Sequence, residues 1–169
     1  MNSEMNLRLM TTAFIFKDSR ILMLKRSLDR KLAPGLWTGV GGHLEPNEIR
    51  DPKIACLREI YEETGINENE IKSIKLRYIL LRQKGMELRQ QFVYICETYK
   101  EEVINTEEGQ LHWIEIDELQ ELIKPKIIEF MLQHYIEYGN QNNVYVGTMI
   151  DELSAPSMRW IELTDPGDV

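Results

Sequence analysis

The stretch from Gly41 to Ile66 constrains this chain more than any other, because it joins a glycine-rich loop to a helix whose two ends are both marked. Asp51 is a good N-cap residue, and Pro52 suits the first helical position. Gly65 is the residue expected just beyond the end of a helix. The sequence therefore predicts a helix over Pro52–Thr64.

The predicted helix separates apolar residues from carboxylates. Helical spacing gives one face made of Ile54, Leu57, Ile60, Tyr61 and Thr64. It gives an opposite face made of Glu59, Glu62 and Glu63, with the small Ala55 and Cys56 beside them. We expect the first face to pack and the second to gather negative charge.

The acidic face is unfavourable for an isolated helix. Like charges at this spacing cost about 0.2–0.5 kcal/mol per pair, and Glu62 and Glu63 lie at the negative end of the helix dipole. A divalent cation would reverse the sign of this cost. Mg²⁺ fits best, because it prefers oxygen ligands and keeps water and substrate phosphates in its shell.

A simpler interpretation is a solvated acidic face on which Arg58 pairs with Glu62. The preceding loop favours a binding site instead. Its glycines, Gly39, Gly41 and Gly42, allow a sharp turn and a close approach of the backbone to a ligand.

Together, the loop and the helix resemble the Nudix box, in which a glycine and a glutamate precede an Arg-Glu-apolar-x-Glu-Glu-x-Gly-apolar run. The matching residues are Gly42, Glu48, Arg58, Glu59, Ile60, Glu62, Glu63, Gly65 and Ile66. One departure is that the segment Ile49–Leu57 between Glu48 and Arg58 is two residues longer than in the family pattern. The loop before the helix can hold the extra residues, which leaves the position of Glu48 open.

The resemblance implies hydrolysis of a nucleoside diphosphate linked to a group X, by attack of water on phosphorus with the help of Mg²⁺ or Mn²⁺. It makes Glu59, Glu62 and Glu63 metal ligands, with the carbonyl of Gly42 as a further ligand. It also implies that Glu59 orients or deprotonates the water, and that Arg58 holds the glutamates.

MutT-type members of the family use one more metal-binding glutamate, in the loop before a tryptophan-containing strand. Glu108 is the best match, because Gly109 and the segment with Trp113 follow it, and Glu107 is second. A solvated acidic loop is the alternative for this segment. By resemblance, Glu108 is both a catalytic and a metal-binding candidate.

The substrate is the least constrained part of the prediction. The segment Lys31–Trp37, followed by Gly-Gly-His, is similar to MutT-like nucleoside triphosphate diphosphatases, including those that act on oxidised dGTP. Arg26 either holds a phosphate or is a surface arginine, and Trp37 either stacks on a base or belongs to the core. The alternative functions are a pyrophosphatase of ADP-ribose or another nucleotide sugar, and a non-catalytic nucleotide-sensing module.

The resemblance also implies an α/β fold, the Nudix α/β/α sandwich with a mixed β-sheet, in a domain over residues 1–140. The predicted strands are Leu7–Phe16, Ile21–Lys25, Leu36–Val40, Ile71–Leu81, Leu88–Glu97 and Leu111–Ile116. A second helix is predicted over Lys126–Tyr138. Asp117 and Gln120 together predict a capping box that begins a shorter helix before it. Residues 141–169 are predicted to form a C-terminal β-hairpin extension, packed on the same domain or in a dimer contact.

Composition excludes some partners. The chain has 169 residues, with 20 Lys and Arg against 28 Asp and Glu, and its net charge of −8 disfavours binding to a nucleic-acid polymer. No apolar run approaches the length needed to cross a membrane. Cys56 and Cys96 lack metal-ligand spacing, and the sequence shows no export signal, so we expect a cytoplasmic protein with reduced thiols. A small nucleotide is the expected partner, with a homodimer as a further possibility.

Overall fold

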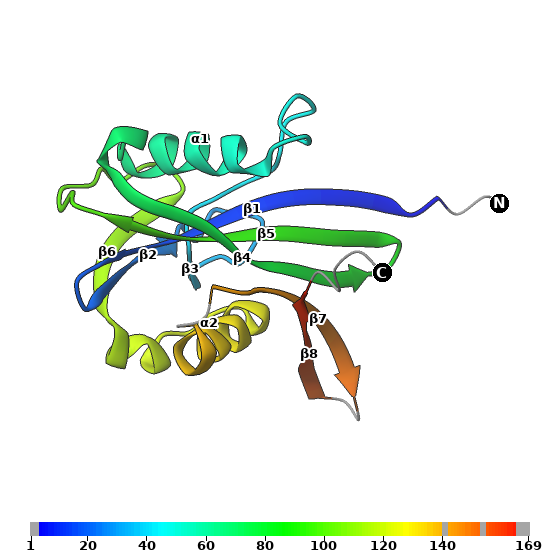
Figure 1. Ribbon diagram of the computed structural model, residues 1–169. Coiled ribbons are helices and arrows are strands. Elements are labelled where there is room, and N and C mark those ends of the chain that lie inside the picture. The colour runs from blue at the N-terminus through cyan, green and yellow to red at the C-terminus, as the bar shows by residue number, and fades with distance from the viewer. Residues whose placement is uncertain (1–3, 140–141, 153–154, 165–169) are drawn as a thin grey trace.

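A mixed β-sheet forms the middle layer of the molecule (Figure 1). The computed structural model describes residues 4–139, 142–152 and 155–164. The strands are β1 (Asn6–Lys17), β2 (Arg20–Arg26), β3 (Trp37–Thr38), β4 (Ile71–Lys84), β5 (Glu87–Thr98), β6 (Gly109–Glu115), β7 (Val144–Glu152) and β8 (Ala155–Leu163). Their order is β3-β2-β1-β5-β4-β7-β8, and β6 pairs with β2. The β1–β5 and β4–β7 pairs are parallel, and the remaining pairs are antiparallel.

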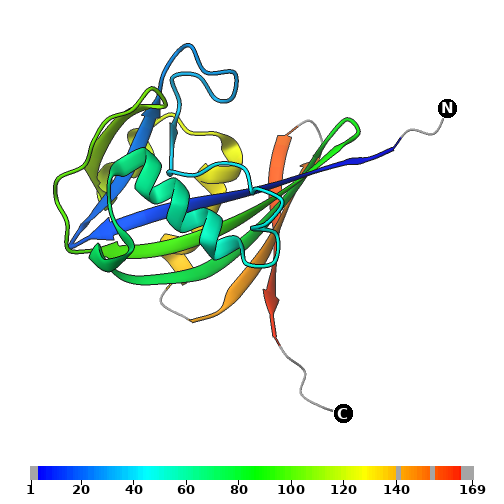
Figure 2. The ribbon, with the colours of Figure 1, turned by 90° about the horizontal axis from the view of Figure 1, so that it is seen from above.

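Two helices cover opposite faces of this sheet, which gives the predicted α/β/α sandwich (Figures 1 and 2). They are α1 (Pro52–Thr64) and α2 (Lys126–Tyr138), and both predicted ranges are confirmed. Side chains alternate along β1, so Phe14 packs in the cluster that contains α2. Its neighbours Ala13 and Ile15 pack in the cluster that contains α1.

The ends of α1 agree with the sequence, and its predicted packing face is confirmed for Ile60 and Thr64 but wrong for Ile54 and Tyr61. The Asp51 side chain accepts a hydrogen bond from the Lys53 amide at 3.1 Å, and Gly65 has a left-handed φ of 75°. The buried residues are Ala55, Cys56, Ile60, Glu63 and Thr64.

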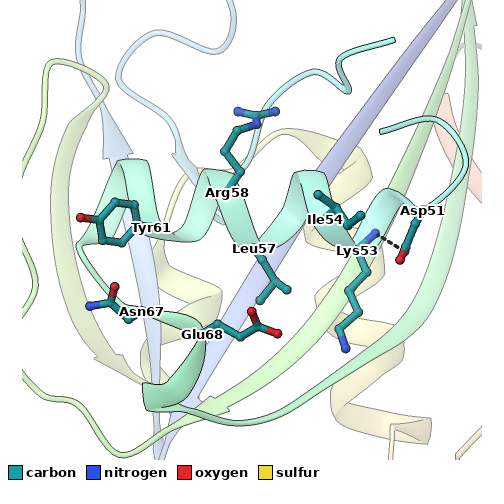
Figure 3. A pocket seen from close by; sticks show the side chains of 8 residues that line it. All are labelled: Asp51, Lys53, Ile54, Leu57, Arg58, Tyr61, Asn67 and Glu68. Carbon is teal, nitrogen blue, oxygen red and sulfur yellow. Dashed lines mark hydrogen bonds between the residues drawn. The ribbon is translucent and has the colours of Figure 1, made fainter. Parts of the chain in front are cut away.

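Ile54 and Tyr61 are 54% and 55% exposed, and with Leu57 they line a pocket on the outer side of α1 (Figure 3). Small side chains at positions 55 and 56 let the helix approach the sheet closely, which turns the larger apolar residues outwards.

Two short 3₁₀ helices complete the fold, η1 (Glu68–Glu70) and η2 (Ile116–Glu121). The predicted capping box at Asp117 is wrong, because the N-cap of η2 is Glu115, two residues earlier, and it makes no side-chain hydrogen bond. The backbone of Glu115 enters this helix directly from β6, so its first residue is set by the end of the strand.

The predicted C-terminal hairpin is confirmed as β7 and β8, and β7 extends the sheet beyond β4. The pairing runs in parallel from Tyr78 with Tyr145 to Leu81 with Thr148. The ring of Tyr78 lies 5.5 Å from that of Trp160 on β8. The hairpin thus covers an edge of the sheet, whereas the domain division at residue 140 and a role in dimerisation stay predictions. None of the described helices has the length and apolar character to cross a membrane.

Candidate active site

Arg58 is the centre of a carboxylate group at the edge of α1. Its Nε and Nη2 atoms donate to both carboxylate oxygens of Glu48, at 2.8 and 2.9 Å. Its Nη1 atom donates to Glu59 at 2.8 Å and to Glu62 at 3.1 Å. Nη2 also donates to the carbonyl of His43 at 3.1 Å, which attaches the helix to the preceding loop. One guanidinium group therefore positions three of the glutamates.

Glu48 belongs to the site despite the longer segment that follows it. It is 3% exposed, and its carboxylate also accepts a hydrogen bond from the Glu45 amide at 2.7 Å. Successive turns, with the Glu48 amide bonded to the Glu45 carbonyl and the Asp51 amide to the Glu48 carbonyl, hold the extra residues. Arg58 dominates the lowering of the Glu48 pKa, and burial opposes it.

The glycine loop approaches the same carboxylates closely, and at Gly41 it does so in a backbone conformation that favours glycine. Gly41 has a φ of 150°, and its amide donates to the Glu63 carboxylate at 2.8 Å. A β-carbon at Gly42 would collide with the Glu59 carboxylate. The Gly42 carbonyl accepts a hydrogen bond from the Thr11 amide at 2.9 Å, which fixes the loop against β1. The two box glycines thus place main-chain atoms directly beside Glu59 and Glu63.

Burial makes the negative charge of these two glutamates costly. The pKa of Glu63 is raised to about 8, chiefly by burial; the nearby carboxylates of Glu59 and Glu108 contribute to the rise, while the Gly41 amide and the charge of Arg26 oppose it. Burial also raises the pKa of Glu59, against the effect of Arg58. A cation at this position would stabilise both charged forms.

Glu108 and Arg26, which sequence analysis proposed separately, lie together. Arg26 contacts the Glu108 carboxylate at 3.3 Å, and its Nε donates to the Leu32 carbonyl at 2.8 Å. Arg30 also pairs with Glu108. No sequence pattern predicted this role of Arg30, although the residue lies in the basic segment that follows β2.

Trp37 lies against the α2 side of the sheet. Its ring is partly buried in the cluster that contains α2, 5.3 Å from the His112 ring, with the Lys25 ammonium 5.7 Å from its centroid. The structure therefore gives Trp37 core contacts, and its stacking on a base stays a prediction.

The donor set suits a hard divalent cation, since the carboxylates of Glu59, Glu62, Glu63 and Glu108 supply only oxygen ligands. In the described part of the chain, no three potential ligand side chains converge on one point. Guanidinium groups engage Glu59, Glu62 and Glu108 directly, which accounts for this arrangement. Glu63 is the exception, because its one hydrogen bond comes from a backbone amide.

Comparisons with known proteins identify the family. A family model described as the NUDIX domain matches residues 7–134. The chain belongs to the Nudix family. It is a Nudix pyrophosphohydrolase, and its substrates contain a nucleoside diphosphate group.

The relatives of this Nudix protein agree in fold. An uncharacterized Nudix hydrolase from Bacillus subtilis (strain 168), YvcI, is 27% identical over 135 residues, which cover 75% of this chain and 80% of that protein. A crystal structure of a MutT protein from Bacillus halodurans has a TM-score of 0.73 and 22% identity, and covers 90% of this chain and 97% of its own. A MutT structure from Methanosarcina mazei Go1 has a TM-score of 0.70 and 18% identity, with coverage of 82% and 99%. The predicted fold and family are confirmed.

Proposed function

We propose that this Nudix enzyme hydrolyses a nucleoside triphosphate to the monophosphate and pyrophosphate, with Mg²⁺ or, in its place, Mn²⁺. The supporting observation is the carboxylate group around Arg58, together with the buried Glu63, which accepts a hydrogen bond from the Gly41 amide of the glycine loop. A triphosphate brings several negative oxygens, and a divalent cation held by these glutamates would attract them.

Each box residue has a distinct proposed role. Glu59 accepts the proton of the attacking water, because Arg58 holds its carboxylate in place beside the glycine loop. Arg58 is a positioning residue, since its hydrogen bonds hold Glu48, Glu59 and Glu62 in one arrangement. Glu59, Glu62, Glu63, Glu108 and the Gly42 carbonyl would hold the divalent cation. When bound, the cation would neutralise charge that develops on the phosphate oxygens.

The substrate side of the site rests on Arg26 and Trp37. The planar guanidinium of Arg26 is proposed to bind the terminal phosphate. Glu108 contacts this guanidinium and holds it in its orientation. Trp37 is proposed to contact the base, and the resemblance around Lys31–Trp37 extends this proposal to oxidised guanine. A cytoplasmic location is part of this proposal, supported by two buried free cysteines.

The test is a product analysis with dGTP, 8-oxo-dGTP and ADP-ribose at saturating Mg²⁺ in ¹⁸O-labelled water. Mass spectrometry should find the monophosphate and pyrophosphate from a triphosphate, with one labelled oxygen per turnover. Release of inorganic phosphate alone, or a catalytic efficiency for ADP-ribose well above every triphosphate, would overturn the assignment. No turnover of any nucleotide in this panel would favour the sensing module.

The metal ligands are tested by Mn²⁺ titration. Glu62→Gln and Glu63→Gln should weaken Mn²⁺ binding strongly, because each removes a negative oxygen ligand. Glu121→Gln on η2 is the matched control, with the same change of charge away from the box. If both box variants bind Mn²⁺ as tightly as the parent protein, the metal site has been placed wrongly.

A further inference from the structure

Three arginines form a row across three neighbouring strands. The pairing register aligns Arg8 on β1 with Arg89 on β5, and Arg89 in turn with Arg82 on β4. Side chains of directly paired residues point to the same face of a sheet. The three guanidinium groups therefore lie side by side on one surface.

This surface is the α2 side of the sheet. Leu80 is two positions from Arg82, and Val93 is four positions from Arg89, and both pack in the cluster with the α2 residues. Even spacing keeps residues of a strand on the same face. The row lies where β1, β4 and β5 continue past both helices, near β7 and β8 (Figure 1).

The row contains more positive than negative charge. Arg8 and Arg89 share the carboxylate of Glu87, which lies 3.1 Å from Arg8 and pairs with the Nε of Arg89. Arg82 is half-buried and has no hydrogen-bond or ion-pair partner within residues 4–139, 142–152 and 155–164. Three guanidinium groups thus face one carboxylate, in a chain whose net charge is −8.

Such an arrangement is unfavourable without an anion. Like charges directly opposite each other destabilise a strand pair, and partial burial increases this cost for Arg82. Burial and the charge of Arg89 lower the pKa of Arg82, while Glu87 opposes the effect. Among the described residues, the hydroxyl oxygen of Thr38 is the one fully buried side-chain atom that lacks a hydrogen-bond partner. The unpaired nitrogens of Arg82 are therefore not fully buried, and they reach solvent.

The row also lies next to the box loop. The segment after the box glycines runs antiparallel to β1, with the Gly42 carbonyl bonded to the Thr11 amide and the Leu44 amide bonded to the Leu9 carbonyl. Arg8 is the next residue of β1. At about 3.3 Å per residue, the row begins roughly 10 Å along the strand from Thr11.

We propose that Arg8, Arg82 and Arg89 form a phosphate-binding subsite on the α2 side of the sheet, separate from the metal-binding glutamates. Arg82 and the two free Nη atoms of Arg89 present planar donors that match phosphate oxygens. The phosphate comes either from the group X of a substrate or from a separate phosphorylated regulator. The subsite does not depend on the catalytic assignment.

The test is calorimetric titration of the metal-free protein with inorganic phosphate in the presence of a chelator. We expect saturable binding, weakened by about tenfold or more in Arg82→Gln and Arg89→Gln, because hydrogen bonds to charged groups are strong. Arg20→Gln is the matched control, since Arg20 pairs bidentately with Glu101 in another part of the sheet. Glu87→Gln should tighten binding, because it removes the competing carboxylate.

Absence of saturable binding, or equal binding in the parent and Arg82→Gln, would overturn the proposal. The proposal would also be overturned if Arg26→Gln lost phosphate binding while Arg82→Gln kept it. That result would assign the phosphate to the candidate active site. A kinetic measurement then separates the two sources. If phosphate inhibits nucleotide hydrolysis competitively, and this inhibition is lost in Arg82→Gln, the subsite binds the substrate. If the inhibition is non-competitive and is lost in the same variant, the subsite binds a regulator.

Discussion

At the scale of single residues, the site depends on how each carboxylate is neutralised. Glu48 and Glu62 use Arg58, Glu108 uses Arg26 and Arg30, and Glu63 has only a backbone amide. Glu59 accepts a hydrogen bond from Arg58, and its carboxylate lies against the Gly42 backbone of the glycine loop. It is therefore the residue that we expect to handle the proton.

Glu59→Gln should lower kcat by about 10²–10⁴-fold, the usual contribution of a positioned general base, with a smaller change in KM. The amide keeps the shape of the side chain but cannot accept the proton. Steady-state kinetics at saturating Mg²⁺ measure this, with Glu108→Gln beside it and Glu121→Gln as the control. Near-full turnover in Glu59→Gln would move the role of the base to Glu108 or Glu48.

Arg58→Met should lower the free energy of unfolding by about 3 kcal/mol, because it leaves the carboxylate of Glu48 buried and without its main partner. The double variant Arg58→Met/Glu48→Met should regain part of this loss, with a coupling of about 1 kcal/mol or more. Urea unfolding in chelator gives both values. Strict additivity of the two single variants would contradict a direct role of Arg58 in stabilising Glu48.

At the scale of elements, α1 packs through its small and buried residues and leaves larger apolar ones outside. Ile60 is fully buried between α1 and the sheet, whereas Ile54 is 54% exposed. The asymmetry follows from the box, because Glu59 and Glu63 must reach Gly41 and Gly42 at the edge of β1. That requirement fixes the rotation of the helix about its axis.

Ile60→Ala should therefore cost about 2–5 kcal/mol, because it leaves a cavity in the core. Ile54→Ala removes the same atoms from the outer side of the same helix and should cost less than about 0.5 kcal/mol. Thermal or urea unfolding compares the two. Similar losses in both variants would mean that the outer face is covered in solution.

At the scale of the whole molecule, the C-terminal hairpin continues the sheet. Tyr78 on β4 is fully buried, and its ring contacts the rings of Tyr145, Trp160 and His134. Its hydroxyl lies 3.0 Å from His134 Nδ1, so β4, α2 and the hairpin share one aromatic cluster.

A chain ended at Gly139 should melt at a lower temperature and aggregate more readily, since it exposes the β4 edge and one side of this cluster. Differential scanning calorimetry and light scattering measure these effects, and a chain ended at Thr164 is the control. An unchanged melting temperature in the shorter chain would show that the sheet does not need the hairpin.

Local patterns in the sequence were enough to predict the ends of α1, the range of α2, the main strands and the family. These features depend on local signals: capping residues, glycine at the helix end, alternation in the strands, and the fixed spacing of Glu59, Glu62 and Glu63. Local signals act over a few residues, so they survive without knowledge of the rest of the chain.

The buried face of α1, the position of Glu48 and the partner of each glutamate depend on the tertiary structure. The apolar pattern of α1 favoured the face with Ile54 and Tyr61, but the sheet accepts the face with Ala55 and Cys56. The row of Arg8, Arg82 and Arg89 likewise exists only through strand register. Pairings between distant segments depend on the packing of the whole chain, and one-dimensional spacing does not contain them.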